Sequence, residues 1–354
     1  MHTLSLNPLL EYKQNRKKSI FCIILLCALL PPVVLFSVRL GAMPISAGQT
    51  ARILAGKITG IARWYEDIPK SAVAVIWDLR LPRILCGVLA GAGLAGAGVI
   101  FQAILQNPLA DPYTLGVSTG AAFGASVAIL LNLTLGVRFP VPLMALGFAA
   151  LTLGLVLLIS RRGGGLIGAN LIMGGIILSA ILSAGISFIK MLSGEQVGAI
   201  VFWLMGSLSA RSWSEALLLG SAVLIAGAPA IVYAEDLNLL TLGTRNAEGL
   251  GISVRKTRFF YLLLGAAMTA ACVSVCGIIG FVGLVVPHLL RFSLTSNNRL
   301  LLPLSMLLGA ILLAAADTCA RLLSGGEIPV GVLTTLLGGP FFISIFVRRK
   351  GITE

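Results

Sequence analysis

Long apolar runs without charge, separated by short polar segments, dominate the chain. Eight of these runs contain no Asp, Glu, Lys or Arg, and they approach or exceed the roughly 20 residues that an α-helix needs to cross a bilayer. The pattern therefore predicts eight transmembrane helices. They lie at residues 20–38, 84–106, 115–131, 139–160, 167–189, 216–233, 300–316 and 328–347.

Two further stretches need a separate interpretation. The uncharged stretch 259–290 is too long for one crossing and is interrupted by glycines, which predicts a span near 259–278 and a short one near 281–292. The run 196–210 is shorter and contains two glycines, so we expect a re-entrant or interfacial helix there. The prediction is an all-α integral membrane protein with a ten-helix transmembrane bundle in each subunit.

The distribution of basic residues predicts the orientation. An even number of crossings puts both termini on one side, and both terminal segments are basic, so the positive-inside rule makes that side cytoplasmic. The long outer loop 39–83 also carries basic residues and weakens this bias. We expect a cytoplasmic segment 1–19, a single transmembrane domain 20–347 and a cytoplasmic tail 348–354.

The composition excludes a soluble protein. Hydrophobic residues make up 57% of the 354 positions and charged residues 11%, whereas soluble domains average about 25% charged residues. The net charge of +13 is spread between the apolar runs, which is typical of topology signals rather than of a nucleic-acid surface.

Glycine indicates close helix packing. It occurs 41 times, and inside the predicted spans it recurs four residues apart, as at Gly87 and Gly91 and at Gly120 and Gly124. This spacing lets helix backbones approach each other closely in lipid. The predicted body is therefore a compact bundle.

The motifs of an enzyme are missing. No G-x-x-x-x-G-K-[ST] occurs, so we expect no ATP hydrolysis by a P-loop in this chain. The two histidines, His2 and His288, have no catalytic or metal-ligand partner at a suitable spacing, and His288 reads as a packing or helix-end residue. The G-x-G-x-x-G pattern from Gly91 to Gly96 lies inside a predicted span, where helix packing is its expected role. We expect no enzyme activity and no cofactor bound by this chain.

Two polar features fall outside this pattern. Asp317 and Arg321 lie four residues apart, on one helix face, and form either a structural ion pair or part of a partner-binding mouth. The segment 234–258 is the longest predicted cytoplasmic connection and favours two short helices, at 237–242 and 245–250. The bundle has no ATPase site of its own, so short helices on its cytoplasmic face indicate a docking surface for a separate ATPase subunit.

From about residue 15 to 348 the chain resembles the permease subunits of the iron-siderophore, haem and cobalamin ABC importers, the FecCD family. Many matching blocks occur in the same order. They are Arg80-Leu-Pro-Arg83-Ile-Leu, Gly91-Ala-Gly-Leu-Ala-Gly96, Phe101-Gln-Ala-Ile-Leu-Gln-Asn-Pro-Leu-Ala-Asp-Pro112, Leu115-Gly-Val-Ser-Thr-Gly-Ala121, Gly280-Phe-Val-Gly-Leu-Val-Val-Pro-His-Leu-Leu-Arg291, Ala316-Asp317 with Arg321, Ile328-Pro-Val-Gly-Val-Leu-Thr334 and Gly338-Gly-Pro-Phe-Phe342.

The resemblance implies a larger assembly in a bacterial or archaeal cytoplasmic membrane. Two permease copies, as a homodimer in the simplest case, would surround a central pathway, with two ATPase subunits on the cytoplasmic side and a substrate-binding protein outside. ATP and Mg would be bound by the ATPase subunits, and no nucleic acid takes part. Transport would proceed by alternating access.

The resemblance also assigns roles to residues. Arg80, Arg83 and Arg321 would grip the binding protein. The less favoured alternative for Arg80 and Arg83 is that they anchor a helix at the lipid headgroups. The ATPase-docking residues would be Leu237, Leu242, Arg245, Leu250, Gly251 and Arg255. Residues 161–170 resemble the cytoplasmic gate of the family. Their turn is Gly163-Gly164-Gly165, where the resemblance leads us to expect a polar turn. The candidate gate and pathway residues are Gly164, Gly168, Asn170, Gly174, Ser179 and Ser183.

The expected substrate is a metal chelate, with a ferric siderophore first and haem, cobalamin or molybdate as alternatives. A different class, an ion-coupled secondary carrier, would need acidic residues in the spans, and these are scarce. An integral membrane enzyme has the least support.

Overall fold

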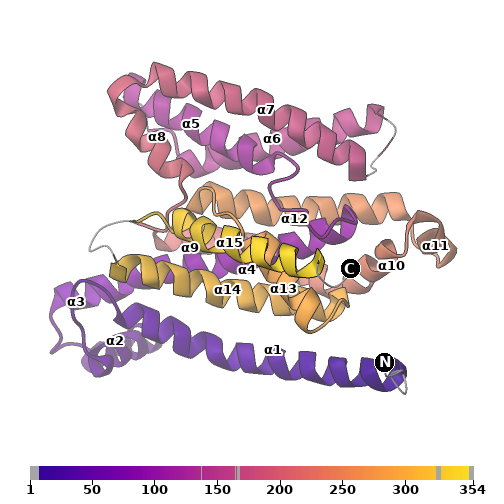
Figure 1. Ribbon diagram of the computed structural model, residues 1–354. Coiled ribbons are helices and arrows are strands. Elements are labelled where there is room, and N and C mark those ends of the chain that lie inside the picture. The colour runs from indigo at the N-terminus through magenta and orange to yellow at the C-terminus, as the bar shows by residue number, and fades with distance from the viewer. Residues whose placement is uncertain (1–7, 137, 164, 166–167, 324–327, 351–354) are drawn as a thin grey trace.

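The computed structural model describes residues 8–136, 138–163, 165, 168–323 and 328–350, and all regular elements among them are helical (Figure 1). Eight helices in this part of the chain are long and apolar enough to cross a membrane, and two shorter apolar helices accompany them. The elements are α1 (Pro8–Arg39), α2 (Ala47–Thr59), η1 (Ala62–Trp64), α3 (Lys70–Ala74), η2 (Val75–Arg80), α4 (Leu81–Ile104), α5 (Val117–Leu135), α6 (Val141–Arg162), α7 (Gly168–Leu192), η3 (Gly194–Gln196), α8 (Val197–Leu204), α9 (Trp213–Val232), α10 (Ala234–Thr241), α11 (Thr244–Gly249), α12 (Val254–Cys276), α13 (Val282–Ser293), α14 (Asn298–Leu323) and α15 (Val330–Lys350).

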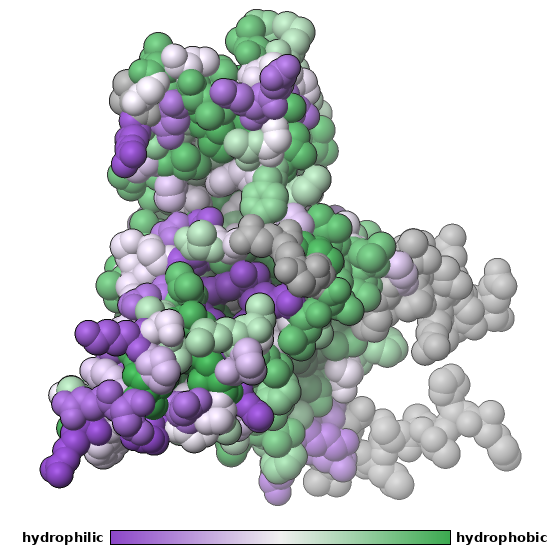
Figure 2. All heavy atoms as spheres, turned by 90° about the vertical axis from the view of Figure 1, so that its left-hand side faces the viewer, coloured by the Kyte–Doolittle hydropathy of each residue, from purple (hydrophilic) through white to green (hydrophobic). Residues whose placement is uncertain are grey.

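The helices form three layers that run in roughly the same direction (Figure 1). The helices α5 to α8 make one outer layer, α1 makes the other, and α4, α9 and α12 to α15 lie between them. We call the end that carries α2 and α3 the outer end and the end that carries α10 and α11 the cytoplasmic end, following the predicted orientation. Figure 2 looks onto the outer end, where hydrophilic residues gather while apolar residues cover the flanks.

The helix α4 is the centre of the bundle and packs against α14, α12, α9 and α13. Its glycines make these contacts close. A Cβ added at Gly91 would lie 2.7 Å from the carbonyl carbon of Gly309 on α14, and one at Gly98 would lie 2.7 Å from that of Gly283 on α13. The packing role predicted from glycine spacing is confirmed for α4, and Gly120 and Gly124 place α5 on α6 in the same way.

The outer segment 39–83 is more ordered than the loop that we expected. Ser46 begins α2 with a capping box, in which its hydroxyl accepts the Gln49 N–H at 3.2 Å and the Gln49 side chain accepts the Ser46 N–H at 3.2 Å. Apolar residues of this segment, including Ile53 and Ile76, form a second core against α1 and the start of α4. The Ser-x-x-Gln spacing is the signal that could have revealed α2.

The predicted split of 259–290 is confirmed. The helix α12 ends at Cys276, and α13 begins at Val282 after an irregular segment inside the bundle. The hydroxyl of Tyr113 donates to the Ile279 carbonyl and accepts the Ile279 N–H at 3.1 Å, which satisfies both polar groups of that residue. Non-helical backbone at this depth is tolerated because protein groups replace the missing helical hydrogen bonds.

The region 196–210 contains a short helix. The helix α8 has eight residues, which is too short to cross a bilayer, and it joins the α5–α7 layer to α9 (Figure 1).

Candidate functional site

Arg80 points into the protein at the outer end. The helix α1 ends at Arg39 and leaves carbonyl groups without helical donors. The Arg80 guanidinium donates through Nη1 to the carbonyls of Val38 (3.2 Å) and Arg39 (2.8 Å) and through Nη2 to that of Met43 (2.7 Å), and only 7% of the residue is exposed. Arg80 therefore caps the end of α1.

Arg83 and Arg321 meet at a buried carboxylate. Asp317 is 1% exposed, and it accepts from Nε and Nη2 of Arg83 at 2.8 to 3.1 Å and lies 3.2 Å from Nε of Arg321. The other guanidinium nitrogens of Arg321 donate to the carbonyls of Leu40 (2.7 Å) and Ser37 (2.9 Å). The predicted pairing of Asp317 with Arg321 is confirmed, and Arg83 joins it from a helix far away in sequence.

This outer arginine cluster (Arg80, Arg83, Arg321 and Asp317) joins α1, α4 and α14. Two of its three cations, Arg83 and Arg321, contact the single acid. Arg80 and Arg321 also bond to carbonyls at the C-terminal end of α1, whose partial negative charge offsets part of the excess positive charge. Among the three arginine side chains of the cluster, Arg83 keeps 16% of its surface exposed, against 10% for Arg321. Binding-protein docking by these arginines stays a prediction, and Arg83 is the best placed for it.

Sequence reasoning missed a second charged pair at the same end. Arg211 donates to Oε1 of Glu215 at 2.7 Å and to the carbonyls of Ser209 and Val275, and both charged residues line a cavity of about 430 Å³. Aromatic residues of α8, Phe202 and Trp203, line the same cavity. The i, i+4 spacing of Arg211 and Glu215 was the available signal.

The helix α7 presents a wide uncharged surface. Between Gly168 and Ile189 it contains no Asp, Glu, Lys or Arg, and Lys190 is the basic residue of its last turn. The exposed side carries large apolar side chains, together with two serines in its second half. The exposed residues include Met173, Ile176, Ile177, Ile181, Ser183, Ser187 and Phe188.

The predicted gate and pathway residues divide between two environments. Gly174 packs against Val156 and Ser160 of α6, and Ser179 lies against Gly116, so both face the bundle. Ser183 is exposed, and its carbonyl accepts the Ser187 hydroxyl at 3.0 Å. These positions make Ser183 the better candidate for contact with a substrate.

The turn before α7 is closed by an asparagine. Asn170 donates to the carbonyls of Gly163 (2.9 Å) and Gly165 (3.3 Å), and Gly168 approaches the Leu105 backbone. Gly164, the remaining predicted gate residue, lies outside the described residues.

The cytoplasmic end carries the two predicted short helices, α10 and α11. The helix α10 begins at Ala234 instead of residue 237, and α11 begins at Thr244 instead of residue 245. Leu242 and Leu250 are 52% and 60% exposed, and Arg245, Gly251 and Arg255 are also exposed. Leu237 differs from these residues because it is fully buried. The surface available to a partner therefore consists of the two leucines and the basic residues around them.

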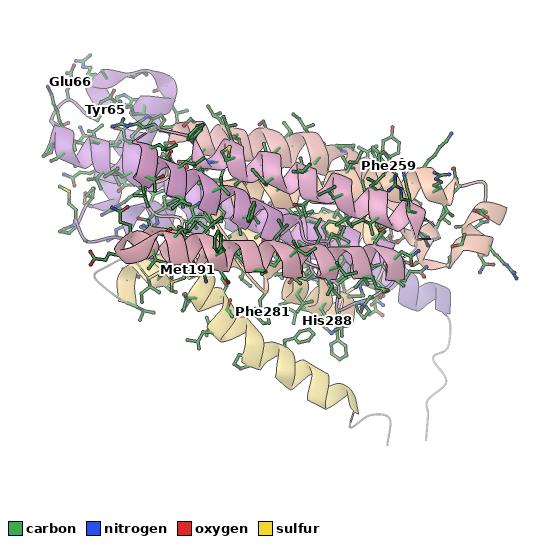
Figure 3. All side chains as sticks on the ribbon, turned by 90° about the horizontal axis from the view of Figure 1, so that it is seen from above. Tyr65, Glu66, Met191, Phe259, Phe281 and His288 are labelled. Atoms are coloured by element: carbon green, nitrogen blue, oxygen red, sulfur yellow. The ribbon has the colours of Figure 1, made fainter. Side chains whose placement is uncertain are left out.

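One aromatic contact lies between α13 and α15. Figure 3 shows Phe281 and His288 at the side of the bundle where α15 diverges from it. The rings of His288 and Phe342 are 5.8 Å apart, and Phe281, with φ of 69°, packs against Gly338 of α15. His288 packs against an aromatic ring, as expected.

Comparisons with known proteins agree with this arrangement. The model of the FecCD transport family matches residues 25–348. A hemin transport system permease of Yersinia pestis is 38% identical over 92% of this chain and 95% of its own length, and a molybdate import system permease of Haemophilus influenzae is 36% identical over 93% and 96%.

Solved structures give the same result. The fold aligns with that of an inward-facing ABC transporter assigned to the metal-chelate type, with a TM-score of 0.80. The two sequences are 34% identical, and the alignment covers 92% of this chain and 98% of the other. The permease of the PsaBC complex of Streptococcus pneumoniae, at 17% identity and a TM-score of 0.52, shares the fold. The family match spans nearly all the predicted membrane helices, and the chain belongs to the FecCD transport family of ABC importer permeases.

Proposed function

We propose that this permease moves a metal chelate, and specifically a ferric siderophore, across the cytoplasmic membrane by alternating access. The observation that carries the proposal is the uncharged exposed surface of α7. A second copy of the chain would cover this surface and leave the substrate pathway between the two copies.

The chemistry of α7 favours an enclosed metal over a free anion. A bare oxyanion such as molybdate is best recognised by cationic or aligned N–H donors. The exposed side of α7 instead offers aliphatic groups, methionine and serine hydroxyls. A chelate that encloses the metal charge can move along a pathway lined by such groups, because they bind it weakly enough for release.

The energy for transport would come from two ATPase subunits docked at the cytoplasmic end. Support comes from the exposed Leu242 and Leu250, which directly follow α10 and α11, from the exposed arginines near them, and from the absence of a P-loop motif in the sequence. A substrate-binding protein would dock at the outer end, with the partly exposed edge of Arg83 donating hydrogen bonds to one of its carboxylates.

The test is uptake into proteoliposomes that contain the permease, its candidate ATPase and its candidate binding protein. We expect ATP-dependent uptake of an iron-loaded hydroxamate siderophore, and weaker uptake of molybdate, cobalamin and haem. Replacement of Arg83 by Glu should abolish the stimulation of ATP hydrolysis by loaded binding protein. Uptake of molybdate above that of the ferric siderophore would contradict the substrate proposal, and uptake driven by an ion gradient without the ATPase would contradict the transport mechanism.

A further inference from the structure

The N-terminal end of α14 is capped by two different elements. The first N–H groups of a helix have no intrahelical acceptor. The Asn297 side chain, just before α14, accepts the Arg299 N–H at 2.9 Å. The Asn298 N–H donates instead to Oδ1 of Asn238, at 2.7 Å, and Asn238 belongs to the short helix α10.

Asn238 makes a second hydrogen bond at the same place. Its Nδ2 donates to Oδ1 of Asn297 at 2.9 Å. The orientation of the Asn238 amide follows from chemistry, because a backbone N–H needs an acceptor opposite it and only the oxygen can serve. One side chain of α10 therefore bonds both to the residue before α14 and to the first residue of α14.

The surroundings hold this link inside the protein. Asn298 is 1% exposed, and α10 packs its buried Leu237 and Leu240 towards the bundle. Gln106, in the turn after α4, donates to the Leu240 carbonyl at 2.8 Å. The exposed leucines of the docking surface, Leu242 and Leu250, lie after these inward-facing residues.

The helix α14 connects this link to the outer end. It has 26 residues, which corresponds to about 39 Å at 1.5 Å per residue. Its last turns carry Asp317 and Arg321 of the outer arginine cluster. Pro303 removes one helical hydrogen bond near the start of α14. Beyond Pro303 the helix is continuous, and it would carry a displacement of the capped end to the arginines.

We infer that Asn238 is a positioning residue that couples movement of the ATPase-docking helix α10 to α14, and through α14 to the outer arginine cluster. This inference rests on the proposed function, because it assigns α10 the force of the ATPase subunits. If the two hydrogen bonds of the Asn238 side-chain amide are lost, α10 can move without moving α14.

The test compares Asn238→Ala with the unaltered permease in proteoliposomes holding the complete importer. ATP hydrolysis is measured with and without loaded binding protein, together with substrate transported per ATP. We expect Asn238→Ala to lower both the stimulation and the transport per ATP by about 5-fold or more, the lower end of ordinary coupling between sites. The variant should still co-purify with the ATPase, because Asn238 bonds inward.

Two further variants separate coupling from folding. Asn238→Asp keeps the acceptor for the Asn298 N–H, and we expect it to retain most of the stimulation. Asn132→Ala is the matched control, since Asn132 also makes two amide hydrogen bonds, to both backbone groups of Phe139 in the α5–α6 turn at the other end. It should behave like the unaltered permease.

The outcomes distinguish the two proposals. Full stimulation in Asn238→Ala would overturn the role of Asn238, and so would a loss of stimulation in Asn238→Asp as large as in Asn238→Ala. In either case, ATP-driven transport by the unaltered permease would still uphold the proposed function. Absence of ATP-driven transport in the unaltered permease would overturn the proposed function itself. If Asn238→Ala does not assemble, Asn238→Leu, of similar size, also removes both amide hydrogen bonds. Full stimulation in that variant would equally overturn the inference.

Discussion

Asp317 is the residue on which the outer arginine cluster depends. It is the one acid in contact with Arg83 and Arg321 among the described residues, and it is almost completely buried. Removal of one partner from a buried ion pair leaves an uncompensated charge, which costs more than the pair itself contributes.

Replacing Asp317 by Ala should lower the free energy of unfolding by about 3–5 kcal/mol, the range for a broken buried ion pair. The measurement is unfolding of the purified permease in mild detergent. Glu66→Ala is the control, because Glu66 is exposed and should change stability by less than about 0.5 kcal/mol. A stability loss no greater than that of the control would contradict the assigned role of Asp317.

The residues of this cluster also mark the limit of prediction from sequence. The Asp317–Arg321 pair follows from helical spacing alone, and the structure confirms it. Arg83 lies 234 positions from Asp317, and Arg80 bonds to carbonyls about 40 positions away. Such contacts depend on how distant helices pack, which hydropathy and spacing do not encode.

At the scale of elements, the central helix α4 is shaped by small residues. Gly91 and Gly98 contact the backbones of α14 and α13 directly. The split between α12 and α13 could be predicted because glycines interrupt an uncharged stretch, whereas the Tyr113 hydroxyl that completes the break could not. The first is a local property of the sequence and the second is a tertiary contact.

Gly98→Ala should destabilise the permease, because the added Cβ would lie 2.7 Å from the Gly283 carbonyl carbon and the backbone there cannot yield cheaply. We expect a loss of about 1–3 kcal/mol, measured by the same detergent unfolding. Gly154→Ala on α6 is matched to it, since nothing lies within 4 Å of the added methyl group. Equal stability of the two variants would show that the α4–α13 contact is not limiting.

At the scale of the whole molecule, the two ends have different surfaces. At the outer end, the three arginines of the outer arginine cluster are bonded to internal acceptors. At the cytoplasmic end, Leu242 and Leu250 are exposed beside basic residues. Apolar residues surrounded by polar ones are typical of a contact surface for another protein.

Leu250→Glu should reduce recovery of the ATPase subunits with the purified permease by about 10-fold or more, as expected for loss of an interface anchor. Ile58→Glu places the same change on α2 at the opposite end, where Ile58 is 74% exposed, and should leave that recovery intact. Undiminished recovery with Leu250→Glu would remove this leucine from the docking surface.

The short helix α13 has a consequence for the biogenesis of the protein. Its 12 residues reach about 18 Å, well short of the roughly 30 Å of a bilayer core. We therefore expect this segment to insert poorly as an independent span during synthesis. The helix α4, which is synthesised earlier, provides a packing surface for α13, because its Gly98 allows close approach of the Gly283 backbone. We expect integration of α13 to depend on the prior insertion of α4.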